Sequence, residues 1–104
     1  MINVKYKKRN YVTNINISGH AMYDEYGKDI VCAAVSSTAL NTLNIIMLID
    51  SSVIDVEKRS GYINIIVNKY NELVDKILLN LIDEFNELVV SYKKYIKVEE
   101  DSHE

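Results

Sequence analysis

Short segments with the apolar alternation of a β-strand are interspersed along this chain with longer segments of helical spacing. Four segments have the period of a strand: residues 2–6, 11–17, 53–57 and 62–67. The polar stretch 7–10 separates the first two, and Ser60 and Gly61 lie between the last two. Short polar or glycine-containing connections join antiparallel strands, so we expect two β-hairpins.

Each hairpin precedes a longer apolar series with the spacing of an α-helix. The first series begins at about Asp29 or Ile30 and ends at Ile49, and Asp29 stands where a carboxylate caps a helix. Its first half consists of small residues and its second half of large aliphatic ones, which predicts a central helix buried on more than one side. In the second series, residues 73–89, charged residues separate the apolar ones. This pattern predicts an amphipathic helix that covers one face of a sheet.

A weak alternation at residues 95–98 adds a candidate fifth strand before an acidic tail at 99–104, which we expect to fray. The resulting order, ββαββα(β), predicts an α+β fold with a mainly antiparallel sheet and helices on one side of it. The chain has 104 residues, the length of one ordinary domain. Residues 1–104 are therefore expected to form a single domain.

The cysteine count limits the chemistry available to the chain. A single Cys excludes an internal disulfide, and one Cys with two His residues falls short of the four ligands of a structural zinc site. Three glycines and no proline also leave no glycine-rich phosphate loop. We therefore expect Cys32 to be a free thiol, with no bound metal and no cofactor.

Charge and hydropathy bear on partners and location. The net charge is −3, and we interpret the basic cluster at 7–9 as a solvated hairpin tip, so no direct nucleic-acid binding is expected. The N-terminus lacks the charged stretch, apolar run and cleavage site of a secretory signal. The longest apolar stretch, around 45–49, is short for a membrane span. These features predict a cytoplasmic protein that does not enter a membrane.

One loop connects the two residues best suited to catalysis. Residues 19–28 lose all periodicity, and they join His20, at the end of a strand, to Cys32, in the first turn of a helix. The partial positive charge of a helix start stabilises a thiolate, and its free amides can donate to the oxyanion that forms on a scissile carbonyl. A loop of this length can return the imidazole of His20 to the thiol, where it acts as base and then as acid. The hypothesis is a Cys-His dyad.

Each of these residues also has a non-catalytic interpretation. Cys32 stands beside two alanines in an apolar helix, which by default indicates core packing. His20 follows a glycine, as turn and surface residues do, and Ser36 is expected to pack on its helix. Asp29 can cap the helix, orient the imidazole, or do both, and capping ranks first.

A motif covers this part of the chain. Residues 19–21 read Gly-His-Ala, and residues 26–36 read Tyr-Gly-Lys-Asp-Ile-Val-Cys-Ala-Ala-Val-Ser. The combination closely resembles the signature of the ribosomal-processing cysteine protease family, called Prp. In that family the His after Gly and the Cys of the Asp-Ile-Val-Cys run form the catalytic dyad, so the resemblance implies that His20 and Cys32 do so here. Gly19 and Asp29 match other positions of the motif.

The resemblance extends to length and element order, and it implies a function. The implied protein is a homodimeric cysteine endopeptidase that removes a short N-terminal extension, with aromatic residues near the cut, from large-subunit ribosomal protein number twenty-seven. A separate hypothesis comes from the residues themselves, because the family match does not assign these tyrosines: the otherwise polar loop at 21–28 would cover the peptide, with Tyr23 and Tyr26 available to contact substrate or to pack when the loop closes. The alternative is a non-catalytic, ribosome-associated module that grips a peptide with the same loop.

Overall fold

The computed structural model describes residues 1–25 and 28–101. In chain order the elements are β1 (Ile2–Arg9), β2 (Tyr11–Ser18), α1 (Ile30–Ile49), β3 (Ile54–Arg59), β4 (Tyr62–Val67), α2 (Glu72–Tyr92) and β5 (Ile96–Glu100). This confirms the ββαββαβ order, including the fifth strand that the sequence indicated only weakly.

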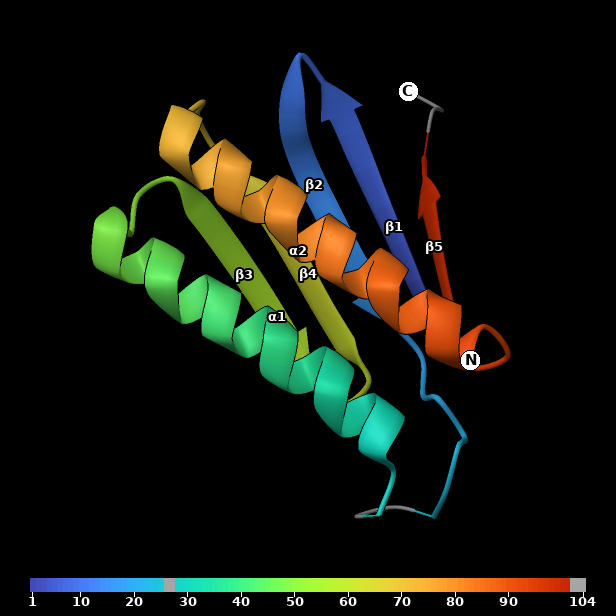
Figure 1. The fold of residues 1–104 in the computed structure, drawn as a ribbon. Coiled ribbons are helices and arrows are strands. Elements are labelled where there is room, and N and C mark those ends of the chain that lie inside the picture. The colour runs from blue at the N-terminus through green and yellow to red at the C-terminus, as the bar shows by residue number, and fades with distance from the viewer. Residues whose placement is uncertain (26–27, 102–104) are drawn as a thin grey trace.

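The five strands form one mixed sheet in the order β3-β4-β2-β1-β5. The β1–β2, β2–β4 and β3–β4 pairs are antiparallel, whereas β1 and β5 run parallel. Figure 1 shows α1 and α2 side by side on the same face of the sheet, with α2 crossing the middle strands and α1 on the β3 side. The fold is therefore the predicted α+β arrangement of one sheet layer and one helix layer.

Both hairpin turns use backbone in the left-handed region. Asn10 alone connects β1 to β2, with φ 66°, so the first connection is shorter than the expected stretch 7–10. Asn reaches this region more readily than most residues, because its side chain is short and polar. Gly61 occupies the same region in the β3–β4 turn, with φ 67°. The sequence therefore predicted both turns correctly, but the connection that it predicted between the first two strands was too long.

The core lies between the helix layer and the sheet. Helix α2 begins at the N-cap Asn71, whose side chain accepts a hydrogen bond from the backbone N–H of Val74 at 3.0 Å. Its inward face contributes Leu78, Leu81 and Phe85, all fully buried, against inward-facing strand residues. The amphipathic pattern of residues 73–89 thus correctly predicted a helix that covers the sheet.

Helix α1 is not the helix that sequence reasoning described as central and buried on more than one side. One face, including Val35, Ala39 and Ile46, is buried in the core, but its C-terminal half exposes Leu48 at 87 % and also Met47. It lies beside α2 rather than between two layers (Figure 1). Sequence reasoning took the aliphatic composition of α1 as a sign of burial on several sides. Within a single chain, much of the apolar surface of α1 is exposed.

The length and composition of α1 also matter for the prediction that the chain does not enter a membrane. Ile30–Ile49 has no charged side chain and a mean hydropathy of 1.6, so by length and composition it could cross a membrane. The apolar segment is therefore longer than the stretch 45–49 that the sequence analysis considered. Its buried face nevertheless belongs to the common core, which is how a core helix passes the same test.

The acidic tail is more ordered than expected. Glu99 and Glu100 lie in β5 and pair with Lys5 and Tyr6 of β1, and the backbone N–H of Asp101 donates to the carbonyl of Tyr6 at 2.7 Å. Parallel pairing with β1 accounts for the order, because it supplies backbone partners that a frayed tail lacks. Residues 102–104 lie outside the described part of the chain.

Candidate active site

Cys32 lies in the first turn of α1, where the sequence predicted it. Asp29 caps this helix, with its Oδ1 accepting hydrogen bonds from the backbone N–H groups of Val31 at 3.0 Å and Cys32 at 2.9 Å. The thiol is free and its residue is only partly buried. A partly exposed thiol at a capped helix start can reach a ligand, which core packing would prevent.

The second oxygen of Asp29 holds the preceding loop. Its Oδ2 accepts a hydrogen bond from the backbone N–H of Tyr23 at 3.0 Å. Burial raises the pKa of this carboxyl, but hydrogen bonds from the backbone N–H groups of Cys32, Tyr23, Asp24 and Val31 outweigh that effect, so the net pKa is lowered. Asp29 therefore stays ionised and ties the loop to the start of α1.

These contacts correct the expectation that the first-turn amides are free to bind an oxyanion. The N–H groups of Val31 and Cys32 already donate to the Asp29 carboxylate, and that of Ala33 donates to the Asp29 carbonyl at 3.1 Å. Among the first-turn residues of α1, all of which the structure describes, only Ile30 has a backbone N–H that donates no hydrogen bond to Asp29. An oxyanion in this cleft therefore needs hydrogen-bond donors from elsewhere.

His20 reaches the same place from the end of β2. Gly19, with φ 97°, makes the turn that leads to it, and its N–H donates to the carbonyl of Gly61 at 2.9 Å. A Cβ on Gly19 would overlap the carbonyl oxygen of Met1, and a Cβ on Gly61 would stand 2.6 Å from Nε2 of His20. The imidazole therefore rests directly against the glycine of the β3–β4 turn.

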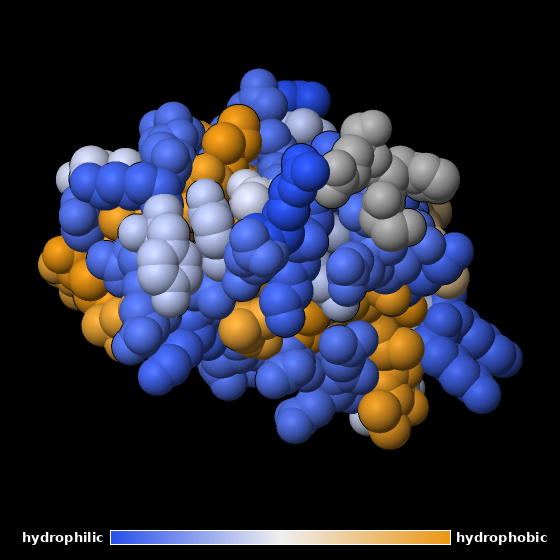
Figure 2. All heavy atoms as spheres, turned by 90° about the horizontal axis from the view of Figure 1, so that it is seen from above, coloured by the Kyte–Doolittle hydropathy of each residue, from blue (hydrophilic) through white to orange (hydrophobic). Residues whose placement is uncertain are grey.

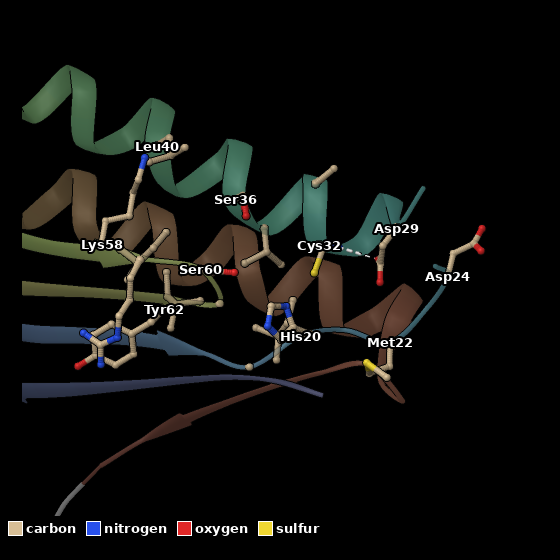
Figure 3. A pocket seen from close by; sticks show the side chains of 18 residues that line it. His20, Met22, Asp24, Asp29, Cys32, Ser36, Leu40, Lys58, Ser60 and Tyr62 are labelled. Atoms are coloured by element: carbon tan, nitrogen blue, oxygen red, sulfur yellow. Dashed lines mark hydrogen bonds between the residues drawn. The ribbon is translucent and has the colours of Figure 1, made fainter. Parts of the chain in front are cut away.

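A cleft of about 800 Å³ contains both side chains. It runs between α1 and the β3–β4 hairpin, and in Figure 3 the sulfur of Cys32 points toward the imidazole of His20 below it. Most of its remaining lining is apolar, including Val35, Leu40 and Ile63. A thiol and an imidazole facing one apolar cleft are the groups that acyl transfer to a cysteine requires.

The other site residues predicted from the sequence divide into two groups. Gly19, Asp29 and Ser36 line the cleft, and Ser36 is exposed there rather than packed. Tyr23 points elsewhere, since its ring packs edge-on against Tyr92 at 5.8 Å and Tyr95 at 5.0 Å between centroids. In this structure the ring of Tyr23 therefore packs within the protein, and its contact with a substrate stays a prediction. Tyr26 lies outside the described residues.

Sequence reasoning did not find the contribution of the β3–β4 hairpin. Lys58, Arg59, Ser60 and Tyr62 line the cleft opposite α1. The turn itself was predictable, but its place beside His20 depends on the pairing of β2 with β4, which no local pattern specifies. Among residues 1–25 and 28–101, no group of three or more His, Cys, Asp or Glu side chains comes together as a metal site.

Comparison with known proteins identifies the family. The family model described as "Cysteine protease Prp" matches residues 1–97. The chain belongs to the Prp family of cysteine proteases. Curated Prp relatives from two strains of Staphylococcus aureus, each described as a ribosomal processing cysteine protease, are 29% identical over 90 residues, covering 84% of this chain and 85% of the relative.

Solved Prp structures have the same fold. A Staphylococcus aureus Prp with a covalently linked product peptide superposes with a TM-score of 0.90 at 27% identity, covering 97% of this chain and 100% of that one. The complex with a substrate peptide gives 0.85 at 25% identity, with the same coverage. SMU.848 from Streptococcus mutans, 23% identical over 96% of this chain and 93% of that one, gives 0.77 and supports the fold alone. This Prp-family chain is therefore a cysteine protease with a two-layer α+β fold.

Proposed function

We propose that Cys32 is the nucleophile of this protease and His20 its general base. The observation that carries this proposal is that both side chains face one cleft, although they come from different elements. Cys32 stands in the first turn of α1, and its sulfur points toward the imidazole that would take its proton. Asp29 acts as a positioning residue, because it caps α1 and anchors the loop after His20 without a hydrogen bond to the imidazole among the described residues.

The chemistry follows the order expected for a thiol protease. His20 takes the proton of the Cys32 thiol as the sulfur attacks the scissile carbonyl carbon, and the resulting imidazolium then protonates the amine as the C–N bond breaks. The acyl group is left as a thioester on Cys32. A water molecule that loses a proton to His20 attacks this thioester, the C–S bond breaks, and the returned proton regenerates the thiol.

The proposed substrate is the N-terminal extension of large-subunit ribosomal protein number twenty-seven, cut near aromatic residues. The Staphylococcus aureus relatives are ribosomal processing proteases, and one was crystallised with a substrate peptide. Here the cleft between α1 and the β3–β4 hairpin is open at the surface and largely apolar, which suits an extended peptide with large apolar side chains. A cytoplasmic location would bring the enzyme to this substrate.

We also propose that the protein works as a homodimer. The C-terminal half of α1 exposes Ile45, Met47, Leu48 and Ile49. In the space-filling view from above, polar side chains predominate and a hydrophobic patch lies at the left edge, on the side where α1 ends (Figure 2). Apolar residues gathered in this way are typical of an association surface.

Cleavage of a peptide that copies the extended N-terminus of the ribosomal protein tests the proposed function. Wild type, Cys32→Ala and the control Ser37→Ala, an exposed residue of α1 outside the cleft, are incubated with it and the products are analysed by mass spectrometry. We expect one cut by wild type and Ser37→Ala and none by Cys32→Ala. Cleavage by Cys32→Ala would refute the nucleophile, and binding without a cut by any variant would favour the non-catalytic peptide-binding module.

A further inference from the structure

The charged groups of the cleft are separated along its length. Asp24 and Asp29 line the end nearest the start of α1, whereas Lys58 lies at the opposite end (Figure 3), and Arg59 is the other cationic residue of the lining. In that view Lys58 extends from β3 toward Leu40 of α1. The dyad lies between these ends, closer to the carboxylates. A peptide lying along the cleft therefore meets acidic groups at one end and an ammonium group at the other.

Lys58 has an unusual orientation for a lysine on an edge strand. It pairs in register with Ile63, a buried core residue of β4, so it projects from the helix-covered face of β3. Its neighbours Glu57 and Arg59 project from the opposite face and form an ion pair at 3.4 Å, and Arg59 also lies over the ring of Tyr62 at 3.8 Å. These contacts give Arg59 partners within the protein.

The ammonium group of Lys58 has no such partner. Over the described ranges 1–25 and 28–101, Lys58 takes part in no ion pair and no hydrogen bond. The nearby cleft surface includes the apolar side chains of Val35, Leu40 and Ile63. A lysine that projects over an apolar groove without a partner can supply a charge-assisted hydrogen bond to a ligand in that groove.

We propose that Lys58 is a specificity-determining residue whose ammonium group binds an acidic side chain of the substrate peptide, three or four residues from the scissile bond. The proposal rests on the proposed function, since it takes the cleft as the peptide site. The position follows from the helix: eight residues from Cys32 to Leu40 rise by roughly 12 Å at about 1.5 Å each. An extended peptide covers about 3.3 Å per residue, so this span corresponds to roughly four residues.

A structural interpretation of Lys58 makes a different prediction. β3 is an edge strand of the sheet, and an inward-pointing charge on an edge strand discourages pairing with another sheet. In that case any charge serves, and Lys58→Glu would leave the choice of substrate unchanged. The specificity role instead requires that the choice of substrate depend on the sign of the charge.

The experiment measures kcat/KM for peptides that differ at one site. Glu, Gln or Lys is placed at the third or fourth residue on either side of the cut, and each peptide is given to wild type, Lys58→Gln, Lys58→Glu and the control Lys97→Glu, on the other edge strand. An ion pair at a partly exposed site is worth about threefold, so attraction of Glu and repulsion of Lys multiply to a preference of roughly tenfold. We expect wild type and Lys97→Glu to prefer Glu over Lys by that factor at one position, Lys58→Gln to lose the preference, and Lys58→Glu to reverse it.

Affinities measured by fluorescence anisotropy in the Cys32→Ala background give a readout that needs no turnover. The same reversal of preference in these affinities would support the role of Lys58 even if no peptide were cut, a result that would overturn the proposed function alone. Cleavage with the same order of preference in wild type and Lys58→Glu, in samples that remain folded by circular dichroism, would overturn the role of Lys58 and leave the proposed function standing.

Discussion

At the scale of single residues, Asp29 links the two halves of the candidate site. One carboxylate oxygen caps the helix that carries Cys32, and the other holds the backbone of Tyr23, three residues after His20. The cap was predictable, because an Asp before an apolar helical series is a strong local signal. The second contact was not, because it depends on where the aperiodic loop folds in space. The same limit applies to Tyr23, whose packing partners Tyr92 and Tyr95 are distant in sequence.

The lowered pKa of Asp29 predicts a pH-dependent contribution to stability. A carboxyl whose pKa is lower in the folded than in the unfolded chain stabilises the fold above its unfolded pKa of about 3.9, and this stabilisation is lost as the pH falls through the folded pKa. Asp29→Asn keeps a capping oxygen but removes this titration. We expect the difference in unfolding free energy between wild type and Asp29→Asn, measured in urea, to be constant near neutral pH and to shrink below about pH 4. A difference that stays the same down to pH 2.5 would show that the charge of Asp29 contributes nothing.

At the scale of elements, local patterns and long-range pairing contribute differently. Period-two segments, glycine at a turn and helical spacing were enough to predict both hairpins and both helices. Strand order was not encoded in any of these patterns, yet the β2–β4 pairing is what brings the β3–β4 turn to His20. The error about α1 has a related cause, because aliphatic content shows that a surface is apolar but not whether another element of the same chain covers it.

The β3–β4 turn is expected to support His20 as well as to close the hairpin. In Gly61→Ala the added methyl group would stand 2.6 Å from Nε2 of His20, so the imidazole must move, and the left-handed backbone adds a strain of roughly 1–2 kcal/mol. We expect lower stability in urea and a loss of kcat that exceeds the loss of folded protein. The matched control is Asn10→Ala, which puts the same residue at φ 66° in the other hairpin, away from the cleft. Equal effects of both variants on kcat would contradict a role for Gly61 in placing His20.

At the scale of the whole molecule, the apolar side of α1 is the surface that no other element of the described chain covers. The chain has a well-formed core between helices and sheet, but Leu48 is 87 % exposed at the C-terminal end of that helix. Under the proposed dimerisation, a second copy of the chain would cover this surface. In a dimer, burial on a second side would come from the partner.

Light scattering coupled to size-exclusion chromatography checks this interpretation. We expect wild type to elute at twice the monomer mass of 12.0 kDa and Leu48→Glu to shift toward the monomer, because a carboxylate buried at an apolar interface is costly. Val90→Glu is the control, since Val90 is 82 % exposed on α2. A monomeric wild type, or a dimer that Leu48→Glu leaves intact, would show that this face of α1 is not the dimer interface.

The intact mass of the enzyme, quenched in acid milliseconds after mixing with the substrate peptide, tests the central claim most directly. The proposed mechanism predicts a thioester adduct, equal in mass to the acyl fragment of the peptide, that maps to Cys32. The adduct should be absent in Cys32→Ala and should form at least about a hundredfold more slowly in His20→Ala, which lacks the base. An adduct on another residue, or acylation at an unchanged rate in His20→Ala, would contradict the assignment of Cys32 and His20 as the catalytic pair.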